Sequence, residues 1–169
     1  MELEKMYKSL TLFSDLDWKA VNEEFETEYK DCSFPEYLQQ KALEGDCPLY
    51  LFELAFYEYA SHELKSLTAT KGPEAGYHIN PTNLFLTLEF DIPRMLKDSE
   101  TGTIEIHEKP HVLCLYKDLK NQVHTCEVTE KQLKALELLE LGPLTDQSQL
   151  SAETKDIFAQ LIQKGLIFS

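Results

Sequence analysis

The sequence predicts an α+β protein, with a mainly helical N-terminal part followed by a small domain of three strands and helices. In the first 100 residues or so, apolar side chains recur every three to four positions, as in amphipathic helices. From Thr103 onwards, short apolar runs alternate with turn residues, as in strands. The polar segment 98–102 separates the two patterns. We therefore predict a helical, acidic domain over 1–100, including one or two strands, and a second domain over 101–169.

The first 31 residues are acidic and are predicted to be helical. Ser14 or Asp15 is placed to cap a helix whose apolar residues have helical spacing: Trp18, Val21, Phe25 and Tyr29. A second helix is predicted after Ser33, because Glu36 lies three residues later, at capping-box spacing. Gly45 is expected to end it.

The longest predicted helix runs from Pro48 to Leu67 and is apolar on two faces, one with Leu51, Leu54, Ala55 and Glu58, the other with Phe52, Phe56 and Tyr59. Such a helix is buried in its own domain or against a partner. Carboxylates on it need hydrogen-bond or charge partners, either inside the chain or on another protein. If the helix helps to build a docking surface, its candidates for a partner interface are Phe52, Glu53, Phe56, Glu58 and Tyr59, an interpretation that rests on a resemblance to a known family and not on composition. The alternative is a core helix with two glutamates at its rim.

A loop over residues 68–78 and a turn over 79–83 precede an apolar run, 84–90, that we predict to be a strand. A short helical segment is expected from Pro93 to Lys97. Three further strands are predicted at Thr103–His107, His111–Tyr116 and Gln122–Val128, with Pro110 separating the first two.

The C-terminal end is predicted to hold two helices and an apolar strand or tail. Thr129 caps the first helix, which Gly142 and Pro143 end and which is rich in leucine: Leu133, Leu136, Leu138, Leu139 and Leu141. The last helix ends at Gly165 and carries Ile157, Phe158, Leu161 and Ile162. Leu166–Phe168 is the expected strand or tail. Together these elements predict a winged-helix arrangement.

Charge and composition exclude some classes of protein. The net charge is −14, which argues against sequence-independent binding to nucleic acid. Residues 1–103 hold 20 acidic and 9 basic side chains, so this part would attract a basic partner. The N-terminus lacks the pattern of a signal peptide and no apolar run is long enough for a membrane span, so we expect a cytoplasmic protein. The four cysteines lack zinc-site spacing, and we expect free thiols, although Cys114 and Cys126 lie on neighbouring predicted strands.

Catalytic motifs are missing from the sequence. It contains no dinucleotide-binding, phosphate-loop or GxSxG motif. His107, His111 and His124 could approach one another on the small sheet with glutamates nearby, but surface histidines on strands are far commoner than metal sites. We therefore predict no catalytic residue, no metal ligand and no cofactor on this chain.

Two stretches carry a resemblance to a known family. The segment Tyr50–Ala60, with Phe34–Leu38 before it and Ile79–Thr82 after it, resembles the HvfC/MbnC-like proteins, which were first catalogued as a DNA-binding domain family. The C-terminal third resembles the PqqD-type winged helix, in Val112–Tyr116, the leucine-rich helix and Leu161–Ile167. Together they cover about residues 34–169. The family begins with a longer helical domain, and often has tryptophan where this chain has Tyr59.

The resemblance implies a non-catalytic protein that forms a heterodimer with a TIM-barrel, multinuclear non-haem iron-dependent oxidative enzyme. Such a protein helps to deliver a cysteine-containing, ribosomally made precursor peptide to the enzyme. The iron ligands belong to the enzyme, so the iron is expected there and not on this chain.

A winged-helix sheet with an open edge accepts a peptide as an added strand, and pockets beside the last helix select its side chains. Our candidates for peptide binding are Gln122, Val123, His124, Thr125, Ile157, Phe158 and Leu161. Each has the alternative of being a core residue.

Two other functions stay open. A winged helix also serves DNA-binding regulators, but residues 151–157, which would enter the major groove, offer one lysine, two carboxylates and no arginine. The third hypothesis is a structural scaffold.

Overall fold

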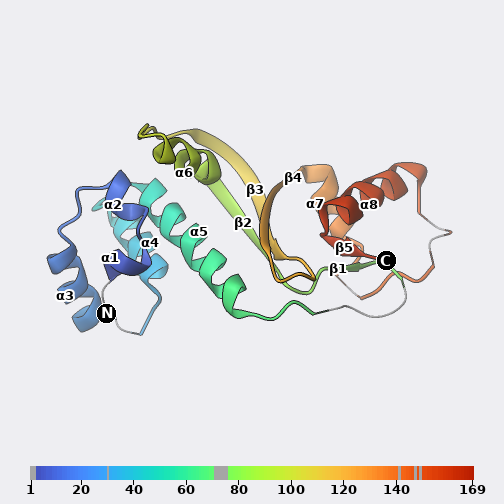
Figure 1. Ribbon diagram of the computed structural model, residues 1–169, viewed down its shortest axis with the longest axis horizontal. Coiled ribbons are helices and arrows are strands. Elements are labelled where there is room, and N and C mark those ends of the chain that lie inside the picture. The colour runs from blue at the N-terminus through green and yellow to red at the C-terminus, as the bar shows by residue number, and fades with distance from the viewer. Residues whose placement is uncertain (1–2, 30, 71–75, 141, 147, 149) are drawn as a thin grey trace. The chain divides into compact units, whose positions relative to one another are not determined.

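The computed structural model describes residues 3–29, 31–70, 76–140, 142–146, 148 and 150–169 (Figure 1). It has an α+β fold with a helical N-terminal part, as predicted. The helices are α1 (Leu3–Met6), α2 (Leu10–Phe13), α3 (Trp18–Glu28), α4 (Phe34–Glu44), α5 (Leu49–Ser66), α6 (Ile92–Glu100), α7 (Glu130–Glu137) and α8 (Ala152–Lys164). The strands are β1 (His78–Ile79), β2 (Asn83–Phe90), β3 (Glu108–Lys117), β4 (Val123–Val128) and β5 (Ile167–Phe168).

The chain forms two compact units. Unit 1 consists of Met1–Ala60 and Leu88–Pro110, and unit 2 of Ser61–Thr87 and His111–Ser169. The chain passes from one unit to the other within α5, β2 and β3. The division therefore differs from the contiguous domains that the sequence suggested, because residues 98–102 lie inside unit 1, at the end of α6 and in the turn after it.

Unit 1 is built around an aromatic cluster centred on Phe34, the first residue of α4. The Phe34 ring lies 4.8 Å from that of Tyr7 and 5.5 Å from that of Phe25, measured between centroids. The capping box predicted at the start of α4 is present, and the helix ends at Gly45 in the left-handed conformation. The cap of α3 is Asp17, which accepts hydrogen bonds from the backbone of residues 19 and 20, and not Ser14 or Asp15.

The larger sheet has the strand order β2-β3-β4. The predicted strands over 84–90, 111–116 and 122–128 are confirmed as β2, β3 and β4. The predicted strand over Thr103–His107 is wrong, because this segment contains no strand. The third strand of the sheet is β2 instead, which pairs with β3. Pro110 lies within β3 and does not precede it. Pairing with β4 begins at Val112, so the missing N–H of Pro110 costs no hydrogen bond to that strand.

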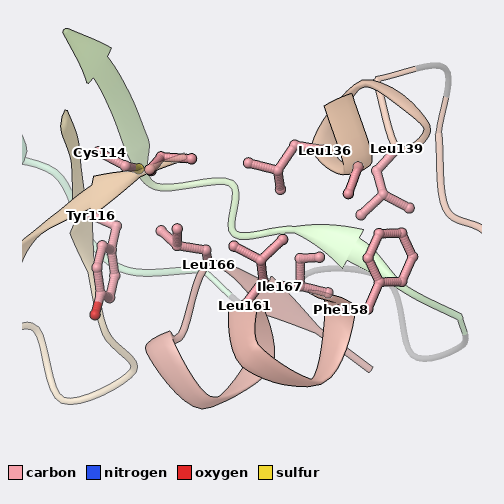
Figure 2. Packing of buried hydrophobic residues seen from close by; sticks show 10 residues of the cluster. Cys114, Tyr116, Leu136, Leu139, Phe158, Leu161, Leu166 and Ile167 are labelled. Atoms are coloured by element: carbon pink, nitrogen blue, oxygen red, sulfur yellow. The ribbon is translucent and has the colours of Figure 1, made fainter. Parts of the chain in front are cut away.

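Unit 2 has a hydrophobic core that β3, α7, α8 and the C-terminal residues share (Figure 2). Its buried members are Cys114, Tyr116, Val128, Ala135, Leu136, Leu139, Phe158, Leu161, Leu166 and Ile167. The predicted helix after Thr129 is confirmed and carries a capping box to Gln132, but it ends at Glu137. Leu141, which the prediction placed in this helix, lies outside the described residues, as do residues 71–75 of the predicted loop.

The C-terminal residues form a strand and not a tail. β5 pairs with β1 in a separate two-stranded sheet, with Ile79 opposite Ile167. The hairpin β3-β4, the helices α7 and α8 and the strand β5 follow the predicted winged-helix order, with β5 apart from the larger sheet.

Asn80 fixes the turn between β1 and β2 and is 1% exposed. Its Nδ2 donates to Lys117 O at 3.0 Å and to Gly165 O at 3.1 Å, and its Oδ1 accepts from Thr82 N. These bonds join the turn to the end of β3 and to the end of α8. Over the described residues, no helix is long and apolar enough to cross a membrane.

Candidate functional site

The strand β4 lies at one edge of the larger sheet and pairs with β3 in antiparallel fashion, from Val112 opposite Val128 to Lys117 opposite Val123. The Asp118 N–H donates to Gln122 O at 2.9 Å. Hydrogen-bonded pairs alternate along an antiparallel ladder, so the backbone groups of His124, Cys126 and Val128 point to β3. Those of the alternate residues 123, 125 and 127 point away from β3. In the described part of the chain, no strand pairs with that second side of β4.

The tight turn before β4 holds the candidate residue Gln122, and Asp118 of this turn also contacts a second candidate, His124 of β4. The Asp118 carboxylate accepts from Gln122 N at 2.8 Å and lies 2.9 Å from His124 Nε2. These hydrogen bonds lower the pKa of Asp118, and the bond from the Gln122 backbone has the largest effect. The His124 ring also stacks on Tyr116, with centroids 5.3 Å apart. The side chain of His124 is therefore positioned within the chain, while Gln122 is exposed.

The candidates on α8 divide into core and surface. Phe158 and Leu161 are 0% exposed, and Figure 2 shows them pointing into the cluster that includes Leu136 and Leu139. Their prediction as peptide-contacting residues is wrong, because helical spacing places them on the face that closes the core of unit 2. Ile157 is half-buried, and it lines a groove of about 200 Å³ with Lys131, Lys134, Ala135, Leu138, Glu153 and Thr154.

Lys164, at the end of α8, reaches the second side of β4. Its Nζ donates to Glu127 O at 3.1 Å and lies 3.5 Å from Gln132 Oε1. Sequence reasoning missed this residue. No local signal indicated it, because its acceptor Glu127 lies 37 residues away in the sequence, on another element.

A second groove, of about 440 Å³, lies between α4 and α5 in unit 1. Three predicted interface residues line it: Phe52, Phe56 and Tyr59. The Phe52 and Phe56 rings are stacked, with centroids 5.8 Å apart. The start of α4 forms the other wall, with Ser33, Pro35, Glu36 and Gln39. The sequence did not indicate this wall, because only tertiary packing brings α4 beside that face of α5.

The two glutamates of the predicted interface are bonded inside the chain. Glu53 is 4% exposed, and its carboxylate accepts from the N–H of Glu89 at 2.9 Å and of Phe90 at 3.1 Å. Glu58 is half-buried and accepts from the Ser9 hydroxyl at 2.5 Å. The placement of Glu53 at a partner surface is therefore corrected, because this buried side chain ties α5 to the end of β2. Glu58 ties α5 to the segment before α2 but is only half-buried, so its place at a partner surface stays a prediction.

Histidine and cysteine side chains are candidates for a metal-binding group. In the parts of the chain that the structure covers, no three side chains of histidine, cysteine, aspartate and glutamate gather in a suitable way. His107 lies 3.0 Å from Asp98. Cys114 and Cys126 are direct partners across β3 and β4, and both are free thiols. Burial raises the pKa of each.

Comparisons with known proteins leave the family open. No protein-family model matches this chain. No curated protein matches it either. The resemblance to the HvfC/MbnC-like proteins therefore stays a hypothesis.

Proposed function

We propose that this chain is a non-catalytic partner protein that binds a ribosomally made precursor peptide and presents it to a multinuclear iron-dependent modifying enzyme. The single observation that carries the proposal is the second side of β4. A peptide that adds there as a strand gains backbone hydrogen bonds, and its side chains alternate between the two faces of the sheet.

Two further features of the structure support this function. The half-buried Ile157 and the exposed Leu138 line the groove beside α8, which offers an apolar pocket for a peptide side chain. The aromatic groove of Phe52, Phe56 and Tyr59 supplies a surface for the enzyme. Unit 1, which carries this groove, holds 20 acidic and 8 basic residues, so a basic patch on the enzyme would complement it.

Substitution of Val123 by proline tests peptide binding. The Val123 N–H points away from β3, so Val123→Pro removes a donor to the added strand and no bond within the sheet. We expect at least a tenfold loss of affinity for the precursor peptide encoded beside the gene, measured by calorimetric titration. Unchanged thermal unfolding is the check on the fold.

Val123→Thr is the matched control, because it keeps the backbone N–H and a β-branched side chain. It should bind as the wild type does. Equal affinity of the proline variant and the wild type would contradict strand addition at β4.

Co-expression with an iron-dependent enzyme encoded nearby tests the partner role. The two chains should co-purify, and Phe56→Asp should weaken the complex because it places a charge in the aromatic groove. Glu63→Gln, on an exposed position of the same helix, is the control. Failure to co-purify under any condition would favour a structural scaffold.

A further inference from the structure

Lys164 carries a positive charge that no carboxylate of the described chain neutralises in an ion pair. Its two acceptors, Glu127 O and Gln132 Oε1, are both uncharged. In contrast, two lysines on the facing helix α7 form ion pairs with carboxylates: Lys131 lies 2.7 Å from Glu153, and Lys134 lies 2.6 Å from Glu130. Lys164 is also only partly exposed, whereas the ion pairs on α7 are at the surface.

The position of the ammonium group matters for an added strand. Val123, Thr125 and Glu127 direct their backbone groups to the second side of β4, because successive residues of the strand alternate between its two sides. Lys164 bonds to the carbonyl of the last of these. A strand that pairs from Val123 onwards therefore meets the ammonium group at Glu127. Lysines at sheet edges commonly limit pairing in this way.

We propose that Lys164 determines the specificity of the peptide site: it ends the added strand at Glu127 and selects a peptide with an aspartate or glutamate side chain at that point. The inference rests on the proposed strand addition. A carboxylate is a better acceptor for an ammonium group than a backbone carbonyl, because the hydrogen bond is then charge-assisted on both sides.

The net charge of unit 2 opposes an acidic peptide less strongly than that of unit 1 does. Unit 2 holds 10 acidic and 8 basic residues, in contrast to the strongly acidic unit 1. Charges beyond about 8 Å are largely screened at physiological ionic strength. The charge on Lys164 therefore outweighs the net charge of the whole chain for a side chain in contact with it.

An array of immobilised peptides of about twelve residues tests the inference. The peptides alternate valine and threonine, and one position at a time is changed to aspartate, asparagine or lysine. They are attached through their C-termini, so that only side chains carry carboxylates. The array is probed with the wild-type chain and with Lys164→Met, Lys164→Arg, Lys164→Glu and Val123→Pro. Thermal unfolding of each variant checks the fold.

The wild type should prefer aspartate over asparagine by about fivefold at one position, as expected for a partly exposed ion pair. Lys164→Met should lose this preference, Lys164→Arg should keep it, and Lys164→Glu should prefer lysine at the same position. If the aspartate preference persists in Lys164→Met, the proposed role of Lys164 is overturned. If Val123→Pro abolishes binding in the same experiment, strand addition at β4 still stands. Absence of binding to every peptide would overturn strand addition, and this inference with it.

Discussion

At the scale of residues, buried polar side chains join helices and strands of this protein through hydrogen bonds. Glu53 joins α5 to β2, and Asn80 joins the turn before β2 to β3 and α8. Each of these side chains is almost fully buried and bonds to backbone groups. Backbone groups in such places need partners, because burial without a hydrogen bond is costly. These residues are therefore fixed by the fold and are poor candidates for contact with another protein.

Removal of the Glu53 carboxylate should destabilise the protein. Glu53→Ala leaves the N–H groups of Glu89 and Phe90 without their acceptor, and we expect a loss of about 2 kcal/mol in the free energy of unfolding. Urea denaturation measures it. Glu63→Ala, at an exposed position of the same helix, should change stability by less than about 0.5 kcal/mol. Equal effects of the two variants would contradict the structural role of Glu53.

Stability should also depend on pH through Glu24. The Glu24 carboxylate lies 2.6 Å from Lys41 Nζ and accepts from the Tyr37 hydroxyl at 2.9 Å, and the Lys41 bond is the main cause that lowers its pKa. A carboxylate with a lowered pKa in the folded state stabilises the protein above its ordinary pKa of 4.5. This stabilisation is lost as the pH falls through the folded-state value.

Glu24→Gln should therefore be less stable than the wild type at about pH 7, by roughly 1 kcal/mol or less for this partly exposed group. The difference should narrow below about pH 4, because the wild-type carboxylate is then protonated. Urea denaturation at both pH values measures it, with the exposed Glu23→Gln as the control. A difference that stays constant with pH would count against this account.

At the scale of elements, the end of α5 depends on a lysine from β3. Lys117 is 5% exposed, and its Nζ donates to Lys65 O at 3.0 Å and to Leu67 O. The last carbonyls of a helix have no partner within it, so a cation there satisfies them and interacts favourably with the helix dipole. The end of α5 is therefore set by a residue about 50 positions away.

Lys117→Met keeps the apolar stem of the side chain but removes the donor. We expect faster amide hydrogen exchange in the last turn of α5, and a loss of about 2 kcal/mol in stability. Exchange in α8 serves as an internal reference, and the exposed Lys120→Met is the matched variant. Unaltered exchange at the end of α5 would show that Lys117 does not hold the helix end.

At the scale of the whole molecule, the acidity lies mainly in unit 1, and unit 2 is close to neutral. Neither unit offers the excess of lysine and arginine that phosphate contacts need. In α8, the acidic Glu153 near the N-terminus is paired with Lys131 of α7. The helix that would read a DNA groove thus presents no surplus of positive charge at its start.

The chain should accordingly not bind duplex DNA tightly. A mobility-shift assay at low salt, where electrostatic binding is strongest, should give no complex at micromolar protein. A known basic winged-helix protein is the positive control. Tight binding that weakens steeply with added salt would favour the DNA-binding alternative over peptide binding.

The sequence by itself determined the helices and the strands that have clear local signals. Ser33 with Glu36 and Thr129 with Gln132 cap helices through bonds three residues apart, so the pattern alone predicts them. The two apolar faces of α5 were also predicted, because helical spacing fixes them: Leu51, Leu54 and Ala55 are buried, and Phe52, Phe56 and Tyr59 line the groove.

Only the tertiary structure decided which strand and which helix faces meet. Thr103–His107 has strand composition but forms no strand, since β2 pairs with β3 in its place. Helical spacing identified an apolar face on α8, yet it could not distinguish the buried Phe158 and Leu161 from a face that accepts a peptide. Lys164 and Glu127 are 37 residues apart in sequence and hydrogen-bonded in space. Such contacts depend on long-range packing, which local spacing does not encode.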